Sequence, residues 1–398
     1  MKNLDKIIGY PKQVERLELV YDILESPERY RKFDTELPKN LLLYGAAGVG
    51  KTFMAEVLME GCGRTPFYIT ESNCTPKKIK HIFRLAQKKA PSVIFIDDLD
   101  CYTQSFYEVL GKEMENADGE EVFFIATYDG EKDKMNSELS SLSFDFKIEI
   151  PAAEFDDKCK IFQAFFQDKL MDESFELYDF CCFAQDCLCE ELEDIYRMAS
   201  VKAVHEEAGR IGIDHLVKAY LELQETPLAC DFTERTAYHE AGHAAISLLL
   251  GETPACIVLD DDGGYYCARV DFPKTSEEKE IRYLTGLGGR ACEDVFFSSS
   301  GFGSYGDLEK VKNSLEYDLS DLASLGFEFF DATQCESYAY NDLLAKKVRE
   351  ELEHYYERVK KLIAENRSLV TAIVERLKGK HYLLHSEIVR IFDEYRKN

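Results

Sequence analysis

One loop constrains the fold of this chain more than any other segment. Residues 40–44 (Asn-Leu-Leu-Leu-Tyr) predict a buried strand, and Gly45-Ala46-Ala47-Gly48-Val49-Gly50-Lys51-Thr52 follows it directly. This is the pattern G-x-x-x-x-G-K-T between a strand and a helix, in which glycines let backbone N–H groups surround phosphates. In such a loop Lys51 reaches the outer phosphates and the Thr52 hydroxyl holds magnesium. The loop therefore predicts a nucleotide-binding α/β domain.

A second strand supplies the carboxylates that a nucleotide site needs. Residues 92–96 are largely apolar and are followed by Asp97 and Asp98. We expect Asp97 to bind the magnesium ion and Asp98 to orient the attacking water. A solvated strand end is the alternative. Further expected strands, at residues 67–70, 121–127 and 146–150, alternate with helical stretches, which predicts a mostly parallel sheet.

The pattern changes after the expected sheet. Residues 155–223 show helical periodicity throughout, and Thr226-Pro227 marks a break. We therefore predict an α/β domain at 1–152, a small helical lid at 153–228 and a third, mainly helical domain at 229–398. The cysteines at 181, 182, 187 and 189 fit either buried thiols or a second metal site, and their spacing matches no common zinc pattern.

The third domain opens with a predicted helix that carries His-Glu-Ala-Gly-His at residues 239–243. On a helix, His239 and His243 project from one face and can bind one metal ion, while Glu240 reaches a water on that metal. Two imidazoles, a Lewis acid and a carboxylate base are the elements of metal-assisted hydrolysis. Histidines that fill a core are the alternative. Gly242 indicates that another segment packs closely against the helix.

A tetrahedral zinc site requires a third protein ligand from elsewhere in the chain. After the histidine helix we expect strands at 255–259 and 265–272, joined by an aspartate-rich turn, and helices at 276–297, 341–363 and 367–377. The second strand either offers its edge to an extended substrate or is simply paired. Residues 300–307 are rich in glycine, and Asp307 begins a further helix. From the residues alone, Asp307 is either a helix N-cap or a carboxylate that faces the histidines.

Composition restricts the classes of partner. A net charge of −27 over 398 residues argues against nucleic acid or an anionic membrane surface. No apolar run approaches the ~20 residues that span a bilayer, and residues 1–8 do not resemble a signal peptide. The 13 cysteines are an odd number scattered along the chain, which fits reduced thiols better than disulfides. We therefore expect a cytoplasmic protein.

Several short motifs accompany the glycine loop and the histidine helix. They are Ser26-Pro-Glu-Arg-Tyr30, Leu37-Pro-Lys-Asn-Leu-Leu-Leu43, Ala90-Pro91, Gly288-Gly-Arg-Ala-Cys-Glu293 and Asn366-Arg-Ser368. These motifs and the order of the three units resemble the FtsH family of AAA+ zinc metalloproteases. The resemblance covers most of the chain, from about residue 7 to 391. This resemblance implies ATP, Mg²⁺ and Zn²⁺ as cofactors and Asp307 as the third zinc ligand. It also implies a homo-oligomer, a hexameric ring that threads protein substrates into a protease chamber.

The nucleotide domain departs from the family pattern. Asp98 stands where the family has glutamate, Tyr128 where it has a sensor asparagine, and residues 70–74 where it has an aromatic pore loop. Members of the family also carry transmembrane segments before the ATPase domain, and membrane anchoring is not expected of this chain.

The arginines of the family are also missing. The two that a neighbouring subunit would contribute fall at about Ser140 and Ser143, and no arginine lies between Arg84 and Arg197. An arginine finger is worth roughly 10³ to 10⁵ in rate. We therefore predict that a homomeric assembly binds ATP but hydrolyses it slowly.

We predict an FtsH-like, ATP-binding zinc metalloendopeptidase that cleaves unfolded or delivered proteins. One alternative is a regulatory subunit in a mixed ring with a complete FtsH-like protease, which would supply the arginines. Another is a nucleotide-binding adaptor whose metal site is only structural. The intact His-Glu-Ala-Gly-His motif favours the peptidase, because a purely regulatory role leaves the base Glu240 without a function.

Overall fold

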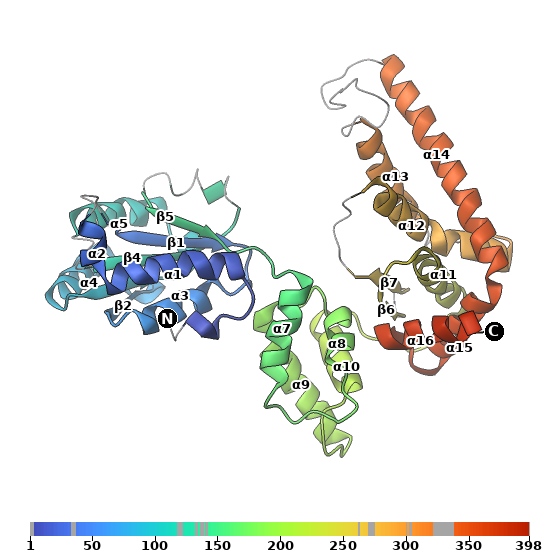
Figure 1. Ribbon diagram of the computed structural model, residues 1–398, viewed down its shortest axis with the longest axis horizontal. Helices are drawn as coiled ribbons and strands as arrows, with labels where there is room; N and C mark the ends of the chain where they lie inside the picture. Colours follow the sequence, from blue (N-terminus) through green and yellow to red (C-terminus); the bar gives the residue numbers. More distant parts are fainter. Residues whose placement is uncertain are drawn as a thin grey trace. The chain divides into compact units, whose positions relative to one another are not determined.

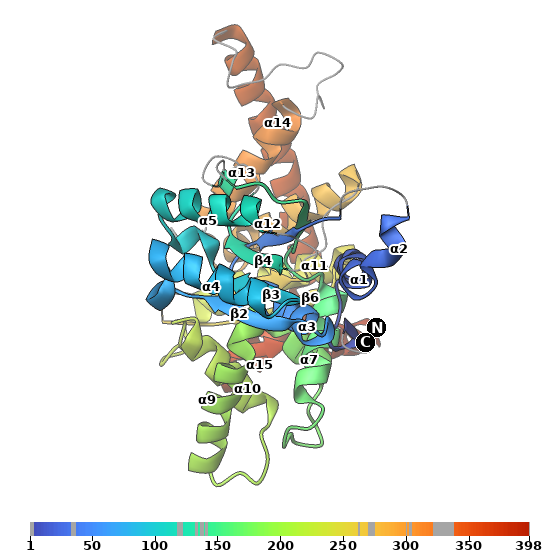
Figure 2. The same cartoon turned by 90° about the vertical axis from the view of Figure 1, so that its left-hand side faces the viewer.

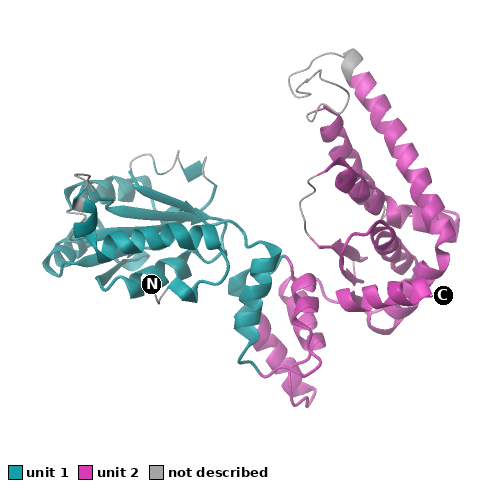
Figure 3. Ribbon diagram, in the orientation of Figure 1, with its two compact units in different colours: residues 1–169, 186–194 teal, residues 170–185, 195–398 magenta. Residues whose placement is uncertain are grey.

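The computed structural model describes residues 4–32, 37–117, 122–131, 134–135, 139, 142–261, 263–269, 275–299, 301, 305–320 and 338–397. The chain forms two compact units, coloured separately in Figure 3. Unit 1 comprises residues 1–169 and 186–194, and unit 2 comprises residues 170–185 and 195–398. The segment predicted as a lid, 153–228, is divided between these units. Its existence as a separate domain stays a prediction.

Unit 1 is built on a five-stranded parallel sheet in the order β2-β3-β4-β1-β5. Its strands are β1 (Asn40–Gly45), β2 (Thr65–Ile69), β3 (Ser92–Ile96), β4 (Val122–Asp129) and β5 (Phe146–Glu149). Its main helices are α1 (Pro11–Glu25), α2 (Pro27–Arg31), α3 (Lys51–Gly61), α4 (Pro76–Lys88), α5 (Gln104–Asn116) and α7 (Phe155–Phe166). The predicted α/β class with a parallel sheet is confirmed.

Each central strand of this sheet is buried on both faces. In β1, Leu41 and Leu43 join the core that α1 and α3 cover, whereas Leu42 and Tyr44 join the core that α4 and α5 cover. Successive side chains of a strand point to opposite faces, so a strand between two helical layers must be apolar throughout. Figures 1 and 2 show these helices on the two sides of the sheet.

Unit 2 is mainly helical, with one small antiparallel sheet in the order β7-β6-β8. Its strands are β6 (Pro254–Val258), β7 (Tyr265–Ala268) and β8 (Tyr382–Leu384), and its helices include α8 (Leu177–Phe183), α10 (Ile213–Leu223), α11 (Glu234–Leu250), α12 (Ser276–Phe297), α13 (Tyr305–Ser320), α14 (Tyr338–Glu365), α15 (Arg367–Lys380) and α16 (His385–Lys397). Helix α9 (Leu192–His205) crosses the boundary between the units. The end of the strand predicted at 265–272 lies outside the described residues. None of the described helices combines the length and apolar character of a membrane span.

Helices α11 and α12 pack with almost nothing between their backbones. A Cβ atom on Gly242 would lie 2.5 Å from the carbonyl oxygen of Gly288 and 2.6 Å from Cβ of Cys292. Conversely, a Cβ atom on Gly288 would lie 2.7 Å from the carbonyl oxygen of Gly242. Only glycine fits at these two positions, because a backbone atom cannot move aside as a flexible side chain can. The close packing that Gly242 predicted is confirmed.

We expect Gly242→Ala to lower the free energy of unfolding by about 1–3 kcal/mol, the usual cost of an overfilled core. Gly379→Ala in α15 is the matched control, because its added Cβ would meet nothing within 4 Å. In the control, alanine should be neutral or slightly stabilising, as it is in most helix interiors. Urea unfolding followed by circular dichroism measures both variants. Equal midpoints would contradict the close crossing.

Candidate functional site

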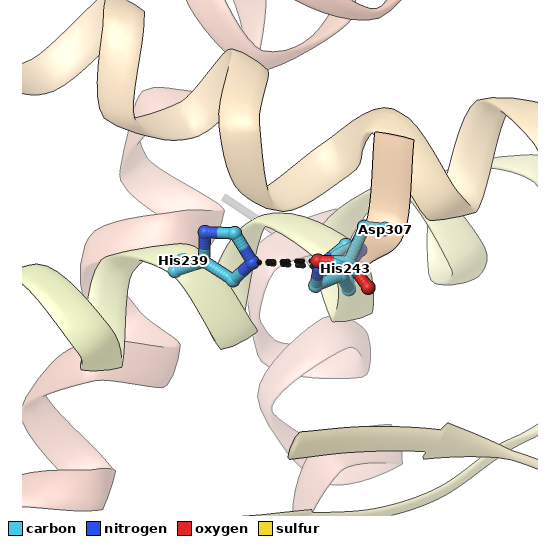
Figure 4. Close-up of side chains that lie close together, drawn as sticks. All are labelled: His239, His243 and Asp307. Atoms are coloured by element: carbon cyan, nitrogen blue, oxygen red, sulfur yellow. Dashed lines mark hydrogen bonds and ion pairs between the residues drawn. The ribbon is translucent and has the colours of Figure 1, made fainter. Parts of the chain in front are cut away.

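Three side chains from α11 and α13 converge on one point in unit 2. His239 and His243 lie one turn apart on α11, and Asp307 lies in the first turn of α13. The Nε2 atom of His239 lies 3.0 Å from Oδ2 of Asp307 and 3.1 Å from Nε2 of His243. Nε2 of His243 lies 3.4 Å from the same carboxylate oxygen, and Figure 4 shows the cluster. The three residues predicted as metal ligands therefore lie together.

The other ring nitrogen of each histidine is held by α12. Nδ1 of His239 lies 2.8 Å from Oε1 of Glu293, and Nδ1 of His243 lies 2.7 Å from the carbonyl oxygen of Thr285. Burial raises the pKa of Glu293, but hydrogen bonds from Arg235, His239 and a backbone N–H outweigh burial and keep the pKa below its usual value. Both acceptors can only accept, so Nδ1 of each ring donates and Nε2 of a neutral ring presents a lone pair.

Two imidazole lone pairs and a carboxylate oxygen thus face one another across 3.0–3.4 Å. Three electron-rich atoms at this separation repel unless they share a cation. A tetrahedral zinc ion with ligands at about 2.0–2.1 Å places its ligand atoms about 3.3 Å apart. The observed triangle fits such an ion.

The electrostatics of the cluster also favour a positive charge. Burial lowers the pKa of His239, but the Asp307 carboxylate, Glu240 and Glu293 outweigh burial and raise the pKa to about 9. Burial raises the pKa of Asp307, yet hydrogen bonds and charge from both histidines hold it well below its usual value. A proton or a metal ion can supply the positive charge, and only a metal ion satisfies all three atoms at once.

Glu240 lies beside this cluster and lines a cavity of about 790 Å³ with the three residues. Its side chain is only 5% exposed, and burial raises the pKa of its carboxyl group. Within the described part of the chain, no hydrogen bond engages this carboxylate. A raised pKa suits a group that accepts a proton from water and later releases it. The edge strand β7 borders the same cavity through Tyr265, Tyr266 and Ala268.

Sequence reasoning missed the supporting residues on α12. Glu293 belongs to the quoted motif Gly288-Gly-Arg-Ala-Cys-Glu293, to which no role was assigned. In the same motif, a Cβ atom on Gly289 would overlap the Nε2 atoms of both histidines. Arg235 is a further missed residue, because its Nη1 lies 2.7 Å from Oε2 of Glu293. The sequence shows this motif, but it does not show which residues the motif contacts. Those contacts depend on how α12 crosses α11.

The glycine loop of unit 1 connects β1 to α3 as predicted. Gly48 and Gly50 have positive φ angles of 70° and 97°, which favour glycine. A cavity of about 580 Å³ is lined by residues 47–54 of the loop and helix, and by Asp98. This arrangement fits a phosphate-binding loop.

The Thr52 hydroxyl donates to Oδ1 of Asp97 at 3.0 Å, and the Thr127 hydroxyl donates to the same oxygen at 2.6 Å. Hydroxyl and carboxylate therefore meet where a magnesium ion would bind. The roles of these residues stay predictions.

The end of β4 brings one further residue to the site. Tyr128, which stands where the family has a sensor asparagine, is 2% exposed in the core with α4 and α5. Asp129 lines the nucleotide cavity and pairs with Lys51. The two-residue period of β4 places the side chains of these two residues on opposite faces of the sheet. Ser140 lies outside the described residues.

Two clusters among the described residues have metal-ligating groups close together: His239, His243 and Asp307, and Asp98, Asp100 and Asp129. Neither includes a cysteine. The structure therefore offers no support for a second metal site at the cysteines of 181–189.

Comparisons with known proteins match both parts of the chain. Residues 41–152 match the family model of the ATPase family associated with various cellular activities, AAA. ATP-dependent zinc metalloprotease FtsH 2 of Thermoanaerobacter sp. (strain X514) is 25% identical over 98% of this chain and 82% of its own length. FtsH of Pelobacter propionicus is 24% identical over 97% of this chain and 70% of its own length. ATP-dependent zinc metalloprotease FTSH 11, chloroplastic/mitochondrial, of Arabidopsis thaliana is 23% identical over 98% of this chain and 53% of its own length.

We expect Glu293→Gln to weaken zinc binding by about 10- to 100-fold, the usual effect of removing a carboxylate that orients a histidine ligand. The neighbouring Asp294→Asn is the control, because Asp294 accepts a hydrogen bond from Tyr356 and none from the histidines. Competition with a chromogenic zinc chelator measures both affinities. Equal affinities for the two variants would show that Glu293 does not orient His239.

Proposed function

We propose that this chain, which has an AAA ATPase domain and is similar to FtsH proteases over most of its length, is an ATP-binding zinc metalloendopeptidase. Its substrates are unfolded proteins or proteins delivered by a partner. One observation carries the proposal: the Nε2 atoms of His239 and His243 and a carboxylate oxygen of Asp307 meet within 3.4 Å. The buried Glu240 beside them supplies the base that hydrolysis requires.

In this proposal His239, His243 and Asp307 would hold zinc, which would supply a Lewis acid for the scissile carbonyl and for the attacking water. Glu240 accepts the proton of the attacking water and passes it to the leaving amine. Glu293 and the Thr285 carbonyl accept from the Nδ1 atoms, so the Nε2 atom of each neutral ring carries the lone pair. These contacts leave each imidazole ready to bind a metal without a change of tautomer.

The outer edge of β7 is a binding surface for an extended peptide in this proposal. Among the described strands, β7 pairs with β6 alone, and the Gln185 side chain donates to the carbonyl oxygen of Ala268. Its residues line the cavity that also contains Glu240. A substrate strand that pairs with this edge would be held by backbone hydrogen bonds, which gives little sequence selectivity. Broad selectivity fits a protease of unfolded chains.

The nucleotide acts in assembly or gating more than in forceful unfolding. We propose that ATP with Mg²⁺ binds the loop of residues 45–52, with Thr52 and Asp97 near the metal ion. The chain then assembles as a homo-oligomer, a hexameric ring by likeness to its relatives. Asp98 would orient the attacking water. Its backbone has a positive φ angle of 49°.

Glu240→Gln tests the peptidase directly. We expect cleavage of labelled casein to fall by at least about 100-fold, because proton transfer by a positioned side chain contributes roughly 10²–10⁴ in rate. Zinc content, measured by elemental analysis, should stay at the level of the unmodified protein, since Glu240 is not a ligand.

Glu277→Gln in α12 is the matched control, because this glutamate is exposed and lies outside the cavity lining. It should retain full cleavage. Undiminished cleavage in Glu240→Gln would remove the proposed base. If the unmodified protein binds zinc but cleaves no casein, the result would instead favour a nucleotide-binding adaptor whose metal site is only structural.

ATP turnover by the purified protein should be slow. No arginine occurs between Arg84 and Arg197, so this stretch cannot supply an arginine finger to a neighbouring subunit. We expect steady-state turnover well below about 1 per second. A coupled phosphate-release assay measures turnover of the protein alone and after mixing with a complete FtsH-like protease. Turnover near 1 per second in the protein alone contradicts this expectation, and activity only in the mixture favours a regulatory subunit.

A further inference from the structure

The lysine of the phosphate-binding loop is already engaged by groups of unit 1. Lys51 is 4% exposed, and its Nζ atom donates to the carbonyl oxygen of Ala46 at 2.6 Å and to that of Gly45 at 3.3 Å. The same Nζ atom forms an ion pair with Asp129 at the end of β4. A phosphate oxygen that binds Lys51 therefore meets a carboxylate in the same place.

Asp129 is held in this position by the backbone. Its own N–H donates to Oδ1 of Asp100 at 3.0 Å, and β4 is paired with β1 through Asp129 and Gly45. The strand thus delivers the carboxylate to the mouth of the loop, whereas Tyr128 is anchored in the core. These contacts fix the backbone of Asp129 at the end of β4, from which its side chain reaches Lys51.

The other charged residues of the nucleotide cavity add to the negative charge of Asp129. Among the described residues that line the nucleotide cavity, the cations are Lys6 and Lys51, and Lys6 pairs with Glu60 at 2.6 Å. Asp98 and Glu190 add two further carboxylates to the lining. Metal-ligating oxygens of Asp98, Asp100 and Asp129 lie within 4.8 Å of one another. Negative charge therefore accumulates where the outer phosphates would lie.

We propose that Asp129 is a specificity residue of the nucleotide site, whose carboxylate competes with phosphate oxygens for Lys51 and favours a nucleoside diphosphate over a triphosphate. This inference rests on the proposed function, because it takes the loop of residues 45–52 to bind nucleotide. The lysine of such a loop serves the β- and γ-phosphates. A triphosphate carries one more negative group than a diphosphate, so repulsion by the Asp129 carboxylate beside Lys51 would act more strongly on the triphosphate.

The test compares the affinities of the full chain for ADP and for the non-hydrolysable triphosphate AMP-PNP, both with Mg²⁺, by isothermal titration calorimetry. Asp129→Asn keeps the shape of the side chain and removes its charge. We expect this variant to bind AMP-PNP about tenfold more tightly and ADP only slightly more tightly, because the repelled group is the γ-phosphate. Asp129→Ser is a second neutral variant with the same expected shift, should asparagine impair folding.

Two controls separate charge at this position from charge in general. Asp129→Glu retains the carboxylate and should keep the preference of the unmodified protein. Glu108→Gln removes an exposed charge on α5, outside the cavity lining, and should also leave the preference unchanged. Equal ratios of AMP-PNP to ADP affinity in all variants would overturn the role of Asp129 alone. Failure of the unmodified protein and every variant to bind either nucleotide would overturn the nucleotide site itself.

A thermal readout gives an independent check. Without nucleotide, Asp129→Asn leaves Lys51 as a buried cation without its carboxylate partner, so its melting temperature should fall below that of the unmodified protein. Added AMP-PNP should then raise the melting temperature of the variant by more than that of the unmodified protein, since the phosphates replace the missing carboxylate. An equal rise in both proteins would count against competition at Lys51.

Discussion

The contact between the backbones of α11 and α12 is the constraint on which the metal cluster depends. Where Gly242 meets Gly288, the two helices come close enough for groups of α12 to reach both histidines of α11. Thr285 and Glu293 lie on either side of this contact along α12, and each accepts from one Nδ1 atom. A larger residue at the crossing would move both acceptors away together. One close approach therefore fixes the tautomers of two prospective ligands.

This arrangement buries the carboxylate of Glu293 behind His239, and neighbouring groups of unit 2 stabilise its negative charge. Glu293 accepts from Arg235 and from the backbone N–H of Gly301 as well as facing His239. Arg235 is itself held by the carbonyl oxygen of Ser299 and by the ring of Phe297. The carboxylate behind His239 thus remains ionised although it is 3% exposed. An ionised carboxylate behind an imidazole makes the opposite nitrogen a better electron donor to a metal.

The sequence predicted those features of the two sites that depend on residues close together in the chain. The glycine loop, the acidic strand and the histidine pair each lie within one turn or one strand end, so residue type and spacing sufficed. Asp307 was undecided from the residues alone, because its distance from the histidines depends on the packing of α13. Strand β8 has only three residues, too few to show a period of two. Asp129 was not identified from the sequence, because its contact with Lys51 depends on how β4 pairs with β1.

The two sites differ in how far their chemistry is supported by their surroundings. In unit 2, each prospective ligand and the base have the neighbours that hydrolysis requires: acceptors behind both imidazoles, a carboxylate opposite them and an edge strand beside them. In unit 1, the loop is intact, yet carboxylates gather around Lys51 and the stretch that should supply arginine has none. Phosphoryl transfer depends on positive charge around the γ-phosphate, whereas nucleotide binding can rely on backbone N–H groups. In the proposed function, the chain therefore keeps nucleotide as a ligand while bond breaking takes place at the histidine cluster of unit 2.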